Sequence, residues 1–105
     1  MINTVRSCTV KYCAGTMADS DWDALARGRA LDTQSFCIVA SPARVESKTE
    51  YVAYGHSTIW GPWGDVVGKL EADEGLLVAD IDLEKVNEIR ANIPISMQRK
   101  PELFQ

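Results

Sequence analysis

The sequence predicts an α/β layer arrangement, and three observations support this fold class. A segment with helical periodicity comes first, short apolar segments of strand length follow it, and a second helical segment comes near the end. With 105 residues, of which 46% are hydrophobic and 25% charged, the chain has the composition of one globular domain with a modest core. A core of this size would be stabilised by an assembly partner.

The first predicted helix runs from Asp19 to Gln34, with an acidic or hydroxyl side chain at its start to cap the first turn. Its apolar residues fall near one face because they recur at helical spacing; they are Trp22, Leu25, Ala26 and Ala30. The unbroken apolar run in Ser35 to Ser41 predicts a strand that is covered on both faces. Pro42 ends this strand, and the polar segment from Ala43 to Glu50 is predicted to be an exposed loop.

Three more strands and a second helix complete the prediction. His56 to Trp60 and Asp65 to Leu70 flank a Gly-Pro-Trp-Gly turn, which is typical of a hairpin, and Leu76 to Ile81 is the last predicted strand. Asp82 is placed to cap a helix that Pro94 stops. We expect the two helices to cover one face of the sheet. The other face then needs a cover that this chain does not contain, which indicates a fragment of a larger fold.

Charge and cysteine content limit the partners and the compartment. The net charge is -4 and no basic stripe is present, so nucleic acid is not an expected partner. No apolar run approaches the roughly 20 residues that cross a bilayer, so a membrane is not expected either. Cys8, Cys13 and Cys37 match neither a zinc nor a redox spacing, which indicates free thiols, no metal site and a cytoplasmic location. The first eighteen residues contain no acid and are also similar in composition to a mitochondrial transit peptide.

The residues most open to a functional interpretation lie in and before the hairpin. His56 is the sole histidine, and such a residue is more often a structural imidazole than a catalyst. Ser57 is its neighbour on a predicted strand and points to the opposite face, which argues against a nucleophile pair. Arg44 follows a strand end, where binding residues are common, although an exposed loop arginine is an equal alternative. A thiol-redox or metal protein built on the cysteines and His56 is a weaker alternative.

Several ordered blocks of sequence resemble the C-terminal third of nitrilase-superfamily carbon-nitrogen hydrolases, and the omega-amidase branch in particular. The blocks are Trp22, Arg27-Gly28-Arg29-Ala30-Leu31-Asp32-Thr33-Gln34, Ala40-Ser41-Pro42-Ala43-Arg44, Tyr54-Gly55-His56-Ser57, Pro62-Trp63-Gly64 and Asp80-Ile81-Asp82-Leu83. The resemblance covers about residues 16–104. It divides the chain into an unmatched N-terminal segment (1–15), the C-terminal part of the hydrolase domain (16–94) and a tail for a subunit contact (95–105).

The resemblance implies a partial α-β-β-α sandwich of the nitrilase type, its C-terminal portion only, in a homo-oligomer or beside a homologous amidase subunit. It also implies hydrolysis of the terminal amides of keto acids, by a cysteine, a glutamate and a lysine, without a metal or organic cofactor. Those three groups belong to family segments upstream of the matched stretch. We therefore expect no catalytic residue in this chain, neither Cys8 nor Cys13 included, and turnover of a small amide only if a second chain complements it.

The resemblance assigns Tyr54 and His56 to positions that line or brace the pocket. Arg44 is the third candidate for such a position. A second function is left open by the sequence. An uncovered sheet face and a loose tail are also typical of a non-catalytic interaction module, which would bind homologous amidase subunits and regulate them.

Overall fold

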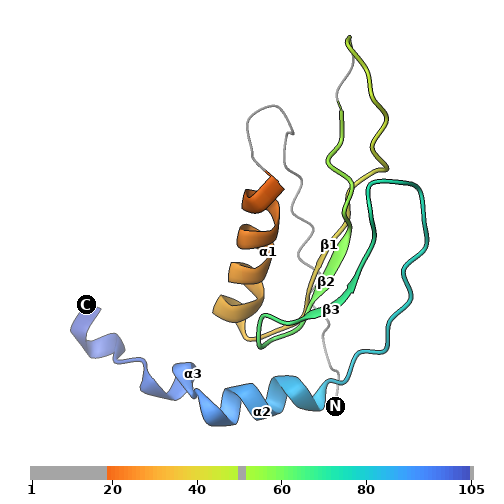
Figure 1. Cartoon of the computed structure of the whole chain (residues 1–105). Helices are drawn as coiled ribbons and strands as arrows, with labels where there is room; N and C mark the ends of the chain where they lie inside the picture. The colour runs from red at the N-terminus through yellow and green to blue at the C-terminus, as the bar shows by residue number, and fades with distance from the viewer. Residues whose placement is uncertain (1–18, 50–51, 105) are drawn as a thin grey trace.

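The computed structural model describes residues 19–49 and 52–104. Within these ranges the elements are α1 (Asp19–Thr33), β1 (Cys37–Val39), β2 (Thr58–Trp60), β3 (Val66–Lys69), α2 (Glu84–Asn92), α3 (Ile95–Gln98) and the 3-10 helix η1 (Pro101–Phe104). Figure 1 shows α1 lying beside the sheet, while α2, α3 and η1 lead away from it as an arm that ends at the C-terminus. No helix in the described ranges is long and apolar enough to cross a membrane.

The three strands form one antiparallel sheet in the order β1-β2-β3. In the first pair, Cys37 lies opposite Trp60. The predicted hairpin between β2 and β3 is confirmed, because the amide of Gly61 donates to the carbonyl oxygen of Asp65 at 2.7 Å across the turn. Gly64 adopts a φ of 75°, a backbone conformation that glycine reaches without a steric cost.

The core lies between α1 and the first two strands, as the periodicity of the first predicted helix indicated. Ala26 and Ala30 are almost fully buried, and their small side chains let the helix approach the sheet closely. Cys37, Val39 and Trp60 contact them from the strands. The burial of Cys37, which is 2% exposed, confirms that its thiol lies inside an apolar strand.

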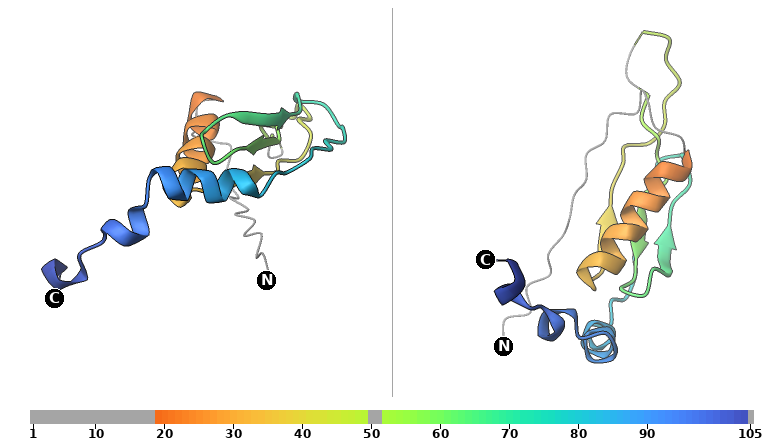
Figure 2. Two further views of the ribbon diagram at one scale, coloured as in Figure 1. Left: turned by 90° about the horizontal axis from the view of Figure 1, so that it is seen from below. Right: turned by 90° about the vertical axis from the view of Figure 1, so that its left-hand side faces the viewer.

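Two predictions about the sheet are wrong. Residues 76–81 form no fourth strand, and Leu76 and Val78 remain exposed over 87% and 82% of their surface. Alternating apolar residues favour a strand, but a strand also needs a hydrogen-bonding partner, and the described ranges provide none for this segment. In addition, α2 does not cover the sheet together with α1: Figures 1 and 2 show it below the end of α1.

A tertiary contact fixes α2 in that place. Gln34, just beyond α1, has a φ of 49° and donates from Nε2 to the carbonyl oxygen of Ile93 at 2.7 Å. Asp82 Oδ1 accepts a hydrogen bond from the amide of Glu84 at 3.0 Å, but the N-cap position of α2 is Leu83, one residue later than predicted, and Leu83 makes no side-chain cap hydrogen bond. The predicted stop is confirmed, since α2 ends before Pro94 and the separate short helix α3 begins after it.

Candidate functional site

Two serines close the base of the loop that joins β1 to β2. The amide of Ser41 donates to Ser57 Oγ at 2.9 Å, and Ser57 Oγ donates to the carbonyl oxygen of Ser41 at 3.1 Å. The amide of Gly55 donates to Ser41 Oγ at 3.0 Å. We call these three partly buried hydrogen bonds the serine clamp. It fixes the backbone on both sides of His56.

The backbone between the clamped residues turns sharply. Gly55 has a φ of 76° and His56 a φ of 54°. A Cβ atom at Gly55 would lie 2.8 Å from Ala72 Cα, so only glycine fits there. A histidine in the left-handed region is uncommon, and residues held in that region cluster at functional sites. The amide of His56 donates to the carbonyl oxygen of Glu71 at 3.1 Å, which supports this conformation.

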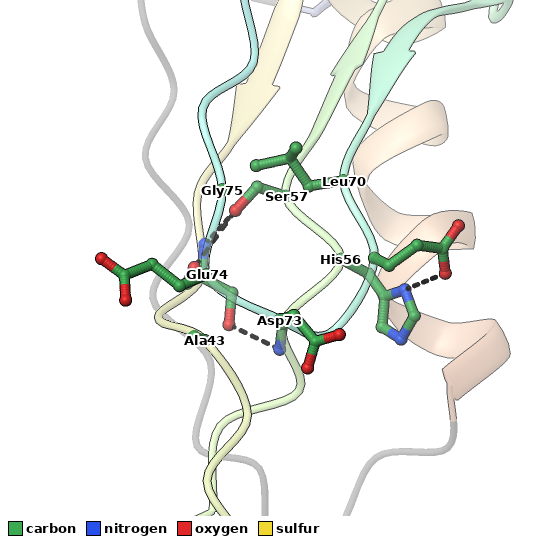
Figure 3. Close-up of a pocket in the computed structure, with 10 residues that line it drawn as sticks. Ala43, His56, Ser57, Leu70, Asp73, Glu74 and Gly75 are labelled. Carbon is green, nitrogen blue, oxygen red and sulfur yellow. Dashed lines mark hydrogen bonds and ion pairs between the residues drawn. The ribbon is translucent and has the colours of Figure 1, made fainter.

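A cavity of about 120 Å³ lies beside the serine clamp (Figure 3). Three segments line it, namely the end of β1, the turn around His56 and the turn after β3; the residues are Ser41, Ala43, Gly55, His56, Ser57, Leu70, Glu71, Asp73, Glu74 and Gly75. Pockets that enclose a whole small molecule commonly measure about 300–1,000 Å³. The cavity beside the serine clamp is smaller than this, so it has the size of one part of a ligand pocket.

The imidazole of His56 is held by aromatic contacts on one side. Its ring centroid lies 4.4 Å from that of Tyr54, and the ring centroids of Tyr54 and Trp22 of α1 lie 6.0 Å apart in a T-shaped arrangement. On the other side, His56 Nδ1 lies 3.8 Å from Glu71 Oε2, which is too long for a hydrogen bond (Figure 3). Nδ1 is buried and has no hydrogen-bond partner among the described residues. The ring thus has a fixed orientation and one unused hydrogen-bonding position.

An ion pair connects α1 to β3 near these rings. Lys69 Nζ lies 2.9 Å from Asp23 Oδ2, and each side chain is 33% exposed. Lys69 Nζ donates a hydrogen bond to Asp23 Oδ2, and this bond raises the pKa of Lys69 above its ordinary value of 10.5. Burial opposes the rise, while the negative charges of Asp23 and Glu71 add to it. The lysine is therefore a protonated structural group at neutral pH.

The structure brings together two of the three residues that the sequence singled out. Tyr54 and His56 are in contact, and His56 lines the cavity. Arg44 is set apart from the cavity: its amide donates to the carbonyl oxygen of Ala72 at 2.7 Å, and its Nε pairs with Glu46 Oε1 at 2.8 Å. Sequence reasoning missed the serine clamp, because Ser41 and Ser57 meet only after the intervening loop folds back.

Of the three cysteines, one lies among the residues that the structure describes. Cys37 is buried in β1, away from the residues that line the cavity. Cys8, Cys13 and the whole of the predicted 1–15 segment lie outside the described residues. Across the ranges 19–49 and 52–104, no three His, Cys, Asp or Glu side chains come together as they would to hold a metal ion.

Comparison with known proteins places this geometry in a family. The sequence profile of the carbon-nitrogen hydrolases matches residues 4–91, and this match begins ahead of residue 16, where we expected the resemblance to start. Omega-amidase NIT2 of Bos taurus is 48% identical over 90 residues, which are 86% of this chain and 32% of that protein. Omega-amidase NIT2 of Xenopus tropicalis is 51% identical over 89 residues, which are 85% and 32% of the two chains.

A solved structure agrees with the sequence comparison. Nit3 of Saccharomyces cerevisiae, a member of branch 10 of the nitrilase superfamily, superposes with a TM-score of 0.68 and 37% identity. The aligned part covers 75% of this chain and 29% of that one. The chain spans about a third of the length of the omega-amidases that it matches, and it has the partial α/β fold of the nitrilase type. This chain belongs to the carbon-nitrogen hydrolase family.

Proposed function

We propose that this chain forms the C-terminal wall of an omega-amidase-like active site, which hydrolyses the terminal amide of a keto acid to the acid and ammonia once the rest of the fold is present. The observation that carries the proposal is the 48% identity to an omega-amidase over 90 residues. The aligned stretch includes the hairpin and the cavity beside it, since it covers 86% of the chain.

The cavity supports a bracing role for this chain. Ser57 Oγ already donates to a backbone carbonyl, so its hydroxyl is committed to structure and does not act as a nucleophile. His56 is held by the ring of Tyr54 and by its own backbone. Amide cleavage needs an activated nucleophile, a proton carrier and oxyanion stabilisation. In our proposal the upstream segments of the family supply all three, and His56 fixes the wall against which the substrate lies.

Complementation tests this proposal. The chain is mixed with a polypeptide that carries the upstream part of bovine omega-amidase NIT2, and ammonia release from alpha-ketoglutaramate is measured. We expect the mixture to exceed the sum of the two separate rates. His56→Ala should lower the rate of the mixture, whereas Lys48→Ala, at an exposed position of the loop between β1 and β2, should leave it unchanged. A mixture that releases no more ammonia than its parts contradicts the proposal.

A second candidate function has its own supporting observation. The C-terminal arm exposes apolar side chains, with Ile95, Met97 and Leu103 exposed over 45%, 86% and 70% of their surface. Exposed apolar residues of this kind are common at protein interfaces. We propose that the arm contacts a neighbouring subunit, either in a homo-oligomer or on a homologous amidase, and that the chain acts there as a non-catalytic module.

Binding measurements separate this candidate from the first. In sedimentation experiments with full-length bovine omega-amidase NIT2, we expect association that Met97→Glu weakens. Val45→Glu serves as the matched control, because Val45 is 71% exposed in the loop far along the chain from the arm. A folded monomer that shows no affinity for itself or for the amidase would remove this candidate.

A further inference from the structure

Helix α1 ends in a Schellman motif that has an unusual residue at its central position. The amide of Ser35 donates to the carbonyl oxygen of Ala30 at 3.2 Å, and the amide of Gln34 donates to that of Leu31 at 3.3 Å. Gln34 is the residue of this motif that adopts a positive φ, 49°. Glycine is the usual residue at this position, because a Cβ atom makes the left-handed conformation costly. The backbone conformation alone would therefore favour glycine over glutamine here.

The side chain of Gln34 makes a contact that glycine could not make. It is only 8% exposed, and its Nε2 donates to the carbonyl oxygen of Ile93 at 2.7 Å, across 59 positions of the sequence. A donor-acceptor distance of this length is that of a well-formed hydrogen bond. Buried side-chain amides generally have such a partner. The contact thus gives a physical reason for a glutamine in a conformation that costs free energy.

The acceptor of this hydrogen bond lies at the bend between α2 and α3. Ile93 is the C-cap residue of α2, and its carbonyl oxygen also accepts from the amide of Ile95 at 2.9 Å. Pro94, between them, has a φ of -80° and a ψ of 64°, the geometry of an inverse γ-turn. In Figures 1 and 2, α2 passes below the end of α1 and the C-terminal arm leads away from there. Gln34 therefore holds the arm at the residue where its direction changes.

Within the described ranges, the arm has few other attachments to α1 and the sheet. Ile89 is the one residue of α2 and α3 that is buried. No helix or strand lies between β3 and α2, so the connecting segment does not fix the arm either. Helix α2 has 9 residues, and isolated helices shorter than about 12–15 residues are marginally stable in water. The order of α2 therefore depends on its docking.

We propose that Gln34 is a latch residue, whose side chain docks the bend between α2 and α3 on the end of α1. While the hydrogen bond to Ile93 is made, α3 and η1 have one direction relative to the sheet. When it is broken, the arm is released and α2 unfolds locally, while α1 and the sheet stay folded. The inference goes beyond both candidate functions and depends on neither, because the docked and released states are properties of this chain alone.

Hydrogen exchange on the full-length chain tests the latch. Gln34→Gly removes the donor and supplies the residue that best suits a φ of 49°. We expect the amides of α2 to exchange at least about tenfold faster in this variant, because the arm opens locally. The amides of β1 and β2 should change by less than about threefold. Relief of backbone strain offsets the lost hydrogen bond when the whole chain unfolds, but not when only the arm is released.

A second variant separates the hydrogen bond from the size of the side chain. Gln34→Glu keeps the length of the side chain, but an ionised carboxylate has no donor for the carbonyl oxygen of Ile93. At neutral pH, we therefore expect it to accelerate exchange in α2 as Gln34→Gly does. Gln98→Glu makes the same change at an exposed glutamine of α3 and is the matched control. It should leave the exchange of α2 within about twofold of the unmodified chain.

The outcomes are read after circular dichroism has established that the variants fold. Exchange of α2 at the unmodified rate in Gln34→Gly overturns the latch. Equal acceleration of α2 and of the strands in that variant also overturns it, because Gln34 would then stabilise the whole chain and not the arm. Slow exchange of α2 in a folded Gln34→Glu variant would show that the size of the side chain suffices, which again contradicts the proposal. If Gln34→Glu does not fold, Gln34→Gly decides alone.

Discussion

The hydroxyl of Ser57 accepts a hydrogen bond from the amide of Ser41 at 2.9 Å and donates one to the carbonyl oxygen of the same residue at 3.1 Å. The Ser57 hydroxyl thereby pairs both the backbone N–H and the backbone carbonyl of Ser41. These two groups lie beyond the last residue pair of the β1–β2 ladder, Val39 opposite Thr58. The bonds continue the contact between the two strands after their backbones diverge into the loop of residues 42–54.

Removal of the Ser57 hydroxyl should destabilise the chain. Ser57→Ala deletes both bonds and leaves the partly buried amide of Ser41 without its acceptor, which typically costs about 1–3 kcal/mol. Urea unfolding followed by circular dichroism measures the change. Ser96→Ala, at an exposed position of α3, is the control and should change the free energy of unfolding by less than about 0.5 kcal/mol. Equal stability of the two variants would contradict the role of the clamp.

Two glycines should respond to alanine in opposite directions. Gly55→Ala forces a Cβ atom to within 2.8 Å of Ala72 Cα at a φ of 76°, so we expect a loss of about 2 kcal/mol or more. Gly28→Ala lies within α1 with nothing within 4 Å of the new atom, and it should stabilise the chain by about 0.5–1 kcal/mol. Thermal unfolding of the pair gives the sign of each change. A tolerated alanine at position 55 would show that the turn is not constrained.

The pair between Lys69 and Asp23 should give a pH-dependent contribution. Because the pKa of Lys69 is raised in the folded chain above 10.5, its stabilisation is complete below that pH and is lost as the pH rises through the folded value. Lys69→Met should cost at most about 1 kcal/mol at pH 7, since the side chains are partly exposed. The difference should vanish in strongly alkaline solution. Lys85→Met, on the exposed face of α2, is the control and should change the free energy of unfolding at pH 7 by less than about 0.5 kcal/mol.

The close approach of α1 to the sheet should not tolerate a larger side chain. Ala30 has an exposed fraction of 0% and contacts residues of β1 and β2. Ala30→Leu should therefore destabilise the chain by about 1–3 kcal/mol or more, through overpacking. Ala24→Leu, on the exposed side of the same helix, should change stability by less than about 0.5 kcal/mol. Denaturant titration of both variants decides between a tight and a loose contact.

Local sequence patterns correctly predicted those elements whose formation depends mainly on interactions between residues near one another in the sequence. The helix over Asp19–Thr33 follows from its own periodicity, and the hairpin follows from its glycine and proline turn. The strand predicted at residues 76–81 failed because its formation depends on a partner strand, which no local pattern contains. The position of α2 also could not be predicted, because it depends on the contact between Gln34 and Ile93, which are distant in sequence.

The candidate site was predictable only in part. The residue type and the neighbouring motif singled out His56, and the resemblance to the hydrolases added Tyr54. The positive φ of His56, the serine clamp and the carboxylate of Glu71 depend on how a long loop folds back, so no spacing in the sequence indicated them. Arg44 was chosen from its place after a strand end, but its guanidinium pairs with Glu46 instead of lining the cavity.

The most direct test of the central claim is a chimera of bovine omega-amidase NIT2 in which this chain replaces the homologous third. Ammonia release from alpha-ketoglutaramate is measured after circular dichroism and sedimentation have established that the chimera folds and assembles. We predict turnover by the chimera that His56→Ala reduces and Lys48→Ala does not. A folded and assembled chimera that releases no ammonia would contradict the claim that this chain forms a wall of an amidase site.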